Sequence, residues 1–408
     1  MIRIGLSLAA MTLATLAAAQ QPTDLRTGEE DFAADFYRRA AADEGNLVVS
    51  PWSLRLALAM TRPGARGETA AELDRVLRLP ADQAHLGPLF AAVNSGLRER
   101  AKSGDETHFQ FEVVNRLWPE RSERMREEYL RILKQDWAAP ATPLDFRGDP
   151  EAARRTINEA VAEATHDLVP ELLKKEDVDK ATRLVLTNAL WLKAAWSEPF
   201  TGRTRAAPFF AGEKETRVGM MRGAKWMRFA ETEAAAIGAL PLAGDELEFV
   251  ILLPKERDGL AAIERELDGK TLRAWLARLD GARAQVDLSL PRFKIRWQKS
   301  IRELVNDMGL KVAMSAMADF SDMADPRGLF ISDVIQGACL DVDEKGLEAA
   351  AATAVIMKRG GLRPRDLPTM VCDHPFLWLI RDRVSGTVLF AGRLSDPPAF
   401  EGEGTKTR

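Results

Sequence analysis

The side chains that usually carry catalytic or metal chemistry are scarce in this chain of 408 residues. The candidates are four histidines and two cysteines: His85, His108, His166, His374, Cys339 and Cys372. No two histidines stand at the spacing of metal ligands. The sequence also contains no HExxH, CxxC or G-x-S-x-G motif and no Walker or Rossmann glycine pattern. We therefore expect no metal, no cofactor and no catalytic triad, which makes a hydrolase the weakest class.

Two kinds of ionisable pair have simpler structural interpretations than a catalytic one. Cys372 and His374 could form a thiol and its base, because residues two apart on a strand face the same side. We instead expect both cysteines to be free buried thiols, although a single disulfide between them would also fit their number. The acidic pairs Glu29–Glu30 and Glu127–Glu128 lie on expected helix surfaces and are interpreted as solvated faces.

Residues 1–19 have the composition of a signal peptide. Arg3 is followed by a run of apolar and small residues that ends in three alanines, which predicts cleavage after Ala19. A short membrane anchor is the alternative, but the run is short and no basic flank follows it. We expect a secreted or periplasmic protein. Its net charge of −4 gives no reason to expect nucleic acid or a membrane as a partner.

Hydrophobic periodicity places most helices early in the chain and most strands late, which indicates an α+β fold without regular strand–helix alternation. Helices are expected at 28–43, from Pro51 after a capping Ser50, and at 68–78, 82–102, 120–136, 149–173, 257–279 and 298–310. Strands are expected at 46–50, 109–119, 182–196, within 205–256, at 286–297, and in a hairpin of 374–381 with 386–394.

Five separated motifs, in order, resemble those of the serpins, a family of serine protease inhibitors. They are NLVVSPWSLRLALAM at 46–60, GARGETAAEL at 64–73, TNALWLKAAWSEPF at 187–200, DEKGLEAAAAT at 343–353 and VCDHPFLWLIRD at 371–382. Each motif alone is weak, but the five together span most of 28–397. With the signal peptide, they indicate a bacterial-type secreted member of the family.

The resemblance implies a single serpin domain over 20–408, with three β-sheets, about nine helices and an exposed reactive-centre loop. It also implies a suicide-substrate mechanism. The target protease cleaves the loop, and while the acyl-enzyme persists, the cut loop inserts as a new central strand of the largest sheet. Insertion must be faster than deacylation, so the native state must be a kinetic trap.

The resemblance places the hinge of this loop at Glu344, Gly346, Leu347, Ala349, Ala350, Ala351, Ala352 and Thr353. As a strand, the segment would put Leu347, Ala349, Ala351 and Thr353 on one uncharged face that can be buried. Small side chains enter between packed strands easily, whereas a charge would have to be desolvated. The intact alanines therefore favour an inhibitor over a non-inhibitory, binding or chaperone-like serpin. Leu347 departs from the usual Thr or Ser and is expected to slow insertion at worst.

The position of the cleaved bond stays open between two neighbours. The family's usual count of seventeen residues from Glu344 gives Gly360–Gly361, and a loop one residue shorter gives Arg359–Gly360. Arg359 predicts a trypsin-like target, and Gly360 predicts a subtilisin- or elastase-like one. Arg363 and Arg365 are further candidates. In either case the expected partner is a serine protease held covalently by a monomeric inhibitor, with a cysteine protease as the alternative target.

Two clusters are implied to control insertion. At the point where the sheet first opens, Glu344 is expected to pair with Arg292, beside Trp196. Lower down, four polar residues are expected to hold the central strands together: Ser50, Ser53, Asn188 and Gln336. The family usually has a histidine at the last of these positions. Because glutamine cannot become charged, we expect sheet opening to lack sensitivity to weak acid.

Overall fold

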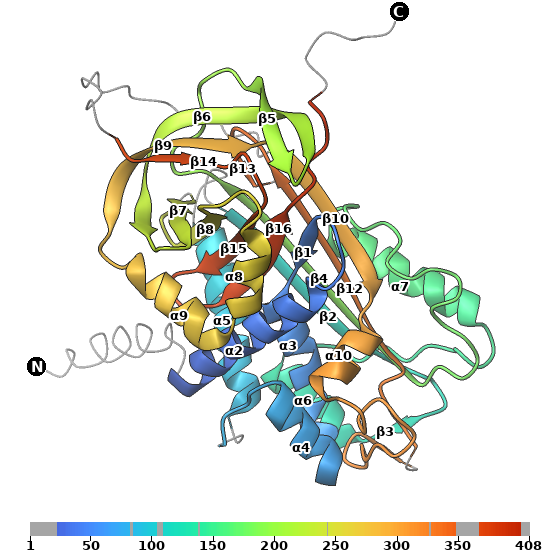
Figure 1. The fold of residues 1–408 in the computed structure, drawn as a ribbon. Coiled ribbons are helices and arrows are strands. Elements are labelled where there is room, and N and C mark those ends of the chain that lie inside the picture. Colours follow the sequence, from blue (N-terminus) through green and yellow to red (C-terminus); the bar gives the residue numbers. More distant parts are fainter. Residues whose placement is uncertain are drawn as a thin grey trace, which may run out of the picture.

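The computed structural model describes residues 23–400, apart from 82–84, 104–108, 138, 243, 326–327 and 348–366. Within these residues the chain forms nine α-helices, one short 3₁₀ helix and three β-sheets of nine, five and two strands (Figure 1). The predicted α+β fold with three sheets and about nine helices is thereby confirmed. The predicted reactive-centre loop lies outside the described residues.

The five-stranded sheet is the one in which a strand is expected to insert. Its order is β10 (Phe293–Ser300), β12 (Asp333–Val342), β13 (Gly346–Leu347), β4 (Leu184–Ala195) and β2 (Phe109–Pro119). Because β13 has only two residues, it separates β12 from β4 at one end only. Farther along, β12 and β4 pair directly and in parallel, with residues 333–337 opposite 185–189.

The nine-stranded sheet packs beside it and contains the C-terminal hairpin. Its path is β1 (Leu47–Val49), β16 (Val388–Leu394), β15 (Phe376–Asp382), β8 (Leu247–Pro254), β7 (Ala235–Pro241), β6 (Lys214–Glu231), β9 (Arg283–Pro291) and β14 (Thr369–Val371), and β5 (Arg205–Ala211) pairs with β6. β15 and β16 are the predicted hairpin, whose turn contains Gly386 at a φ of 81°. The third sheet pairs β3 (Arg124–Met125) with β11 (Ala324–Asp325).

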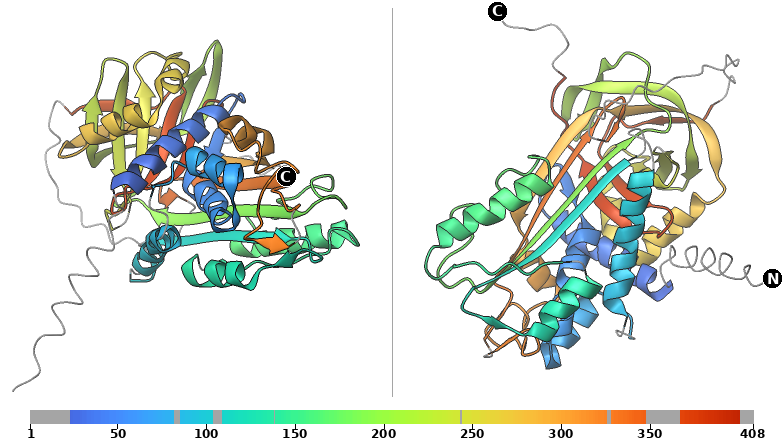
Figure 2. Two further views of the ribbon diagram at one scale, coloured as in Figure 1. Left: turned by 90° about the horizontal axis from the view of Figure 1, so that it is seen from below. Right: turned by 180° about the vertical axis from the view of Figure 1, so that it is seen from behind.

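The helices surround the two large sheets. They are α2 (Thr23–Ala40), α3 (Pro51–Ala59), α4 (Gly67–Val76), α5 (Leu86–Ser103), α6 (Glu127–Asp136), α7 (Pro150–Ala164), α8 (Leu260–Glu266), α9 (Gly269–Arg278) and α10 (Arg302–Met308). α3 and α7 cover opposite faces of the five-stranded sheet (Figure 2). Among the described helices, none has the length and apolar character needed to span a membrane.

Helix α3 begins as its sequence predicts. Ser50 has extended backbone angles, its side chain accepts a hydrogen bond from the Ser53 N–H, and Pro51 occupies the first helical position. All nine residues of α3 are buried. A helix that is buried on every side belongs to the interior of the protein. α3 therefore fixes Ser50 and Ser53 under the five-stranded sheet.

Several expected helices have different limits, and the one expected at 298–310 spans only Arg302–Met308, because β10 continues to Ser300. The helix expected at 149–173 ends at Ala164, and His166 and Asp167 then take positive φ angles of 49° and 60°. The helix expected at 120–136 begins only at Glu127, because the chain first forms β3. The helix expected at 257–279 divides into α8 and α9, since Asp268 caps the start of α9 through the Thr271 N–H.

Two strand predictions also need correction. The strand expected at 286–297 divides at Arg292 into β9 and β10, which belong to different sheets. The sequence did not predict β12 at all. Its sequence, DVIQGACLDV, contains Gly, Gln and two Asp residues, which are not typical of a strand interior. β12 forms because β10 and β4 pair with it on either side. Such pairing cannot be predicted from the strand propensity of one segment.

The acidic pair near the start of α2 is buried, contrary to the expected solvated face. Glu29 and Glu30 are 1% and 2% exposed. One oxygen of Glu29 accepts from the Val388 N–H at 3.1 Å, and the other has no partner among the described residues. Burial raises the pKa of Glu29 to about 8, although the nearby cation of Arg55 lowers it. The second pair, Glu127–Glu128, is exposed as expected.

Replacing Glu29 with Gln should change how stability depends on pH. A raised pKa means that the folded protein binds this proton more tightly than the unfolded chain. The stabilisation is therefore full below about pH 4.5 and is lost as the pH rises towards 8. Between pH 5 and pH 8 the wild type should lose up to about 4 kcal/mol relative to Glu29→Gln. Thermal unfolding midpoints across this range measure the difference.

The exposed residue Glu128 supplies the control. A Glu128→Gln variant should follow the wild-type pH profile. Parallel profiles for Glu29→Gln and wild type would show that the Glu29 carboxyl does not change its proton affinity on folding.

Candidate functional site

The start of the predicted hinge is already a strand in the five-stranded sheet. Leu347 lies opposite Val342 of β12 and opposite Ala194 of β4, and both pairings are antiparallel. Its side chain is fully buried, with 0% exposure. The hinge therefore begins between the two strands that an inserted segment would have to separate.

A tight turn joins β12 to β13. The Asp343 carboxylate accepts from the backbone N–H groups of Lys345 at 2.7 Å and Gly346 at 3.1 Å. The Asp343 N–H donates to the Gly346 carbonyl at 3.0 Å. At Gly346, a Cβ would lie 2.1 Å from the Ala194 carbonyl oxygen. Only glycine allows the backbone to approach β4 this closely, which explains why a glycine heads the hinge.

Trp196 packs against this turn, as expected for the point where the sheet opens. Its indole N–H donates to the Asp343 carbonyl at 2.8 Å, and its backbone N–H donates to the Lys345 carbonyl at 2.9 Å. Its ring meets Phe249 edge to face at 5.7 Å. The Phe200 N–H donates to the Glu344 carbonyl at 2.8 Å. The segment after β4 thus holds the backbone of residues 343–345.

The expected ion pair between Glu344 and Arg292 does not form. In the described part of the chain, the Glu344 carboxylate accepts a hydrogen bond from the Thr204 hydroxyl, and no ion pair joins it to a cation. Arg292 is exposed between β9 and β10, and its backbone N–H donates to the Gly219 carbonyl. The preceding residue, Pro291, ends β9, so Arg292 lies where the chain passes from one sheet to the other.

Three side-chain amides form a row across neighbouring strands. Asn115 of β2 lies opposite Asn188 of β4, and Asn188 lies opposite Gln336 of β12. Asn188 donates to the Asn115 Oδ1 at 2.7 Å, and Gln336 donates to the Asn188 Oδ1 at 2.8 Å. Asn188 and Gln336 are fully buried. One hydrogen bond of this row therefore crosses the boundary between β4 and β12.

The two predicted serines support the row from below. The Gln336 amide donates to the Ser50 carbonyl at 3.0 Å and accepts from the Ser50 N–H at 3.1 Å. The Ser50 hydroxyl donates to the Leu389 carbonyl at 2.8 Å, which links the cluster to the nine-stranded sheet. Asn188 donates to the Ser53 Oγ at 2.5 Å. The structure therefore brings together all four of the residues expected here.

Asn115 is the member that the sequence did not identify. It is 8% exposed, and its amide nitrogen has no partner among the described residues. A buried Asn in the otherwise alternating strand FQFEVVNRLWP was the available signal, because Asn is depleted in strands. Asn115 lies one strand away from the β4–β12 boundary, and its unpaired amide N–H groups can donate to a new partner when the strands move.

The amide row and the β4–β12 pairing hold the five-stranded sheet closed, but both can be broken so that the sheet opens. Separating β12 from β4 breaks the parallel pairing at residues 333–337 and the bond between Gln336 and Asn188. Both groups are neutral, so exposing them to an incoming strand carries no charge-desolvation cost. Four of the predicted hinge residues, Ala349–Ala352, with Thr353, and the candidate bonds at Arg359, Gly360 and Gly361 lie outside the described residues.

Cys372 and His374 have structural roles. Both cysteines of the chain are free. Cys372 is fully buried, and burial raises the pKa of its thiol well above the usual range, which disfavours the nucleophilic thiolate. The His374 ring contacts the Pro254 carbonyl at 2.8 Å and the Asp373 carboxylate at 2.8 Å. The imidazole is thus engaged on both nitrogens.

Comparison with known proteins settles the family. Residues 27–397 match the family model for serpins, described as serine protease inhibitors. The chain belongs to the serpin family. It is 37% identical over 361 residues to a leukocyte elastase inhibitor of Bos taurus, with 86% of this chain and 93% of the relative covered. It is also 35% identical over 368 residues to an uncharacterized serpin-like protein of Thermococcus kodakarensis, covering 90% and 84%.

The solved serpin structures agree with the fold. Serpin48 of the insect Tenebrio molitor superposes with a TM-score of 0.78 at 27% identity, covering 92% of this chain and 98% of that one. The serpin assignment confirms the predicted class, an inhibitor of serine proteases. The narrower prediction of a bacterial-type secreted serpin finds no support in these relatives.

Sheet opening in this serpin should not be accelerated by weak acid between pH 7.5 and pH 5.5. The Gln336 amide does not titrate, whereas an imidazole in its place would charge near pH 6.5. A Gln336→His variant should therefore polymerise on mild heating several times faster at pH 5.5 than at pH 7.5. The wild-type rate should not rise as the pH falls from 7.5 to 5.5, since no group in the amide row titrates there. Native gels of heated samples measure both rates.

A Gln336→Leu variant serves as the non-titrating control. It should polymerise faster than the wild type at every pH, because Asn188 and Ser50 lose their partner. A steep acid-induced rise in the wild type that disappears in Gln336→Leu would contradict the prediction.

Proposed function

We propose that this protein is a suicide-substrate inhibitor of serine proteases, which traps the acyl-enzyme by inserting its cleaved loop between β4 and β12. One observation carries the proposal. β13 already occupies the space between these strands at one end, with Leu347 buried, and beyond it β4 and β12 pair directly. A strand that continues from β13 would therefore run between β4 and β12. It fills the space that opens when the two strands part.

The register of β13 predicts where each inserted residue would arrive. Leu347 is opposite Val342 and Ala194, so an antiparallel continuation brings Thr353 opposite both Gln336 and Asn188. Ala349 and Ala351 would share the buried face of Leu347 on the way. Thr353 carries the only hydroxyl on that face. It can replace the hydrogen bond that Gln336 and Asn188 lose when the strands separate.

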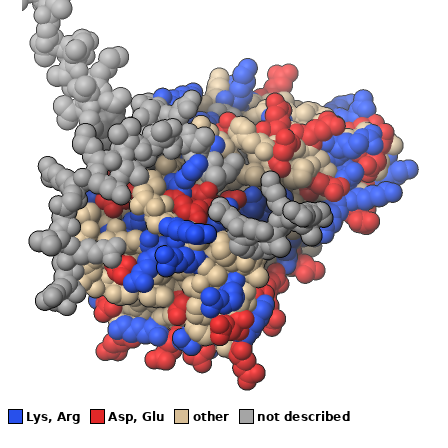
Figure 3. Space-filling view, turned by 90° about the horizontal axis from the view of Figure 1, so that it is seen from above, with Lys and Arg blue, Asp and Glu red and all other residues tan. Residues whose placement is uncertain are grey.

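The target proposed here is an elastase- or subtilisin-like serine protease if the loop is cut at Gly360–Gly361, and a trypsin-like one if it is cut at Arg359–Gly360. Several similar proteins are named leukocyte elastase inhibitors, which supports the first assignment. On the face seen from above, cationic and anionic side chains are interspersed (Figure 3). Such a surface does not select a strongly charged protease, so specificity should depend on the loop.

We also propose that the inhibitor acts as a monomer after export. The support for export is the composition of residues 1–19, with three alanines before the expected cleavage site. N-terminal sequencing of the protein purified from its natural source tests whether residues 1–19 are removed. An intact Met1 on the mature protein would overturn it.

Incubation with proteases tests inhibition directly. The protein lacking residues 1–19 is mixed with trypsin, subtilisin and pancreatic elastase and analysed on denaturing gels. We expect a covalent complex at the summed mass with at least one of them, and mass spectrometry of the released peptide identifies the bond. Cleavage within 357–365 without a complex, at every protease tried, would show a non-inhibitory serpin.

Ala351→Arg should convert the inhibitor into a substrate. This charge would have to be desolvated between β4 and β12 during insertion, which slows insertion relative to deacylation. The covalent complex should fall at least tenfold while loop cleavage continues. Ala350→Arg is the matched control, since it would lie on the other face of the sheet, opposite the partly exposed Cys339. Equal loss of complex in both variants would contradict the proposed face.

Thr353→Val should weaken the cleaved form selectively. The loss leaves one Gln336 N–H and the Asn188 Oδ1 without the partner that replaced their mutual bond, which costs about 1–3 kcal/mol. The thermal midpoint of the loop-cleaved protein should therefore fall, and that of the uncut protein should not. Thr353→Ser, which keeps the hydroxyl, should restore the midpoint. An unchanged cleaved form in Thr353→Val would show that the hydroxyl does not reach the amide row.

A further inference from the structure

Lys225 of β6 is a buried cation whose hydrogen-bond partners are backbone carbonyls. It is only 6% exposed. Its Nζ donates to the carbonyls of Glu198 at 2.6 Å and Pro199 at 2.8 Å, and it lies 4.1 Å from the centre of the Phe200 ring. Within the described part of the chain, no carboxylate forms an ion pair with it. Three successive residues of one segment therefore surround this ammonium group.

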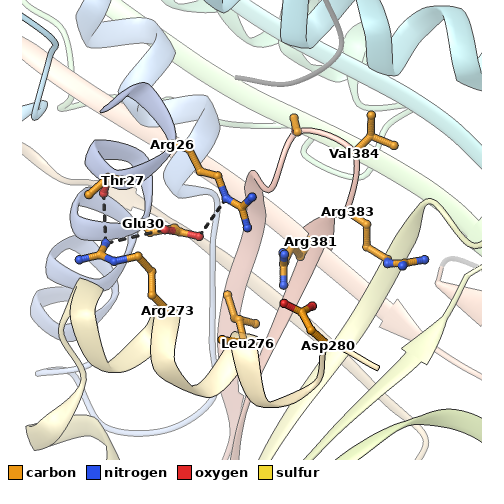
Figure 4. A pocket seen from close by; sticks show the side chains of 11 residues that line it. Arg26, Thr27, Glu30, Arg273, Leu276, Asp280, Arg381, Arg383 and Val384 are labelled. Atoms are coloured by element: carbon orange, nitrogen blue, oxygen red, sulfur yellow. Dashed lines mark hydrogen bonds and ion pairs between the residues drawn. The ribbon is translucent and has the colours of Figure 1, made fainter. Parts of the chain in front are cut away.

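The cations between α2 and α9 differ from Lys225 in this respect. Arg26 and Arg273 both approach the Glu30 carboxylate, at 3.4 Å and 3.7 Å (Figure 4). A carboxylate offsets part of the cost of taking a cation out of water, whereas carbonyl groups supply hydrogen bonds without a net charge. Lys225 therefore remains costly to bury in its charged form.

The surroundings of Lys225 contain little other charge. Glu198, on the covering segment, is the one acid that acts on it. On β9, the residue opposite Lys225 is Val286. The Asp287 carboxylate pairs with Arg222 at 2.7 Å, and both side chains lie on the other face of the β6–β9 pair. Burial consequently lowers the pKa of Lys225 from 10.5 to about 8, although the charge of Glu198 opposes this change.

The segment 198–200 connects the two large sheets near the head of the hinge. It follows β4 of the five-stranded sheet and leads to β5 of the nine-stranded sheet. The Phe200 N–H donates to the Glu344 carbonyl at 2.8 Å, and the Thr204 hydroxyl donates to the Glu344 carboxylate. Lys225 thus fixes, from β6, the backbone that holds Glu344 at the turn before β13.

Opening of the sheet must disturb this segment. Because residues 198–200 follow β4 almost directly, they have to move when β4 moves away from β12. Their movement away from β6 exposes the Lys225 ammonium group to water. Hydration then removes the cost of burying the charge, whereas a neutral amine has no such cost to lose.

We propose that Lys225 is a positioning residue for loop insertion: it holds residues 198–200 against β6 in the closed sheet, and hydration of its charge assists their release when β4 and β12 separate. The inference rests on the proposed insertion mechanism, but it concerns the opening of the sheet and not the protease. The open state binds the Lys225 proton more tightly than the closed state does. Opening should therefore become slower as the pH rises above about 8.

Uptake of a labelled peptide tests this inference without any protease. The peptide has the sequence of residues 348–357, EAAAATAVIM, with both ends blocked, so that none of its groups titrates between pH 7.5 and pH 9.5. Fluorescence anisotropy follows its insertion into the uncut protein. Lys225→Met removes the titrating amine, and Lys225→Arg keeps a cation that stays charged over this range.

The wild-type rate is compared with that of each variant at the same pH, because Glu29 and other groups titrate in this range in all of the proteins. The ratio of wild-type to variant rate should fall by at least about threefold from pH 7.5 to pH 9.5, with either variant as the reference. Lys214→Met is the matched control. Lys214 begins the same strand with its side chain 59% exposed, so this variant should keep the wild-type pH profile.

Two results would overturn the proposal. One is a ratio that stays constant with both reference variants, and the other is an equal loss of the pH profile in Lys214→Met. Failure of the proposed function would look different. A protein that takes up the peptide with the expected pH profile, but forms no covalent complex with any protease, would support the role of Lys225 and contradict inhibition alone.

Discussion

The hydrogen bond from Gln336 to Asn188 joins the two strands that must separate, and much of the structure is organised around it. The Gln336 amide also accepts from the Ser50 N–H and donates to the Ser50 carbonyl. Since Ser50 caps the fully buried helix α3, this helix fixes the position of the Gln336 side chain. A neutral hydrogen bond contributes only about 1 kcal/mol net. Its importance lies in its position, since no strand can pass along the β4–β12 boundary without replacing it.

Neutral and charged polar groups are segregated in this protein. The row at the β4–β12 boundary consists of amides and hydroxyls. Many of the buried charges lie elsewhere, around α2, α3 and the C-terminal hairpin, where Glu29, Arg55 and Arg381 lie, whereas Asp343 is buried at the turn between β12 and β13. Buried ions require fixed partners, and breaking such partners is costly. The amide row at the boundary that has to open therefore consists of neutral groups, while most of the buried ionic groups belong to parts that stay together.

Sequence patterns were sufficient where a local rule dominates. The cap at Ser50 and Pro51, the alternating strand at 109–119 and the C-terminal hairpin all follow from short-range spacing, and the family motifs located Asn188 and Gln336. Tertiary contacts decided the rest. Glu29 has the sequence context of a surface residue, and only the packing of the hairpin against α2 buries it. The Glu344 carboxylate finds a hydroxyl where a cation was expected, because Arg292 lies at the junction between two sheets.

Strand β14 gives the segment after Leu347 a second attachment. Leu347 is fixed in the five-stranded sheet, and Thr369 begins a parallel pairing with β9 in the nine-stranded sheet. The uncut chain is thus a tether of fixed length between two anchors. It cannot supply a full additional strand to one sheet unless β14 detaches from the other. Cleavage of the chain between β13 and β14 removes this restraint, because the segment that follows Leu347 is then no longer connected to β14. Under the proposed mechanism, each molecule can therefore act only once.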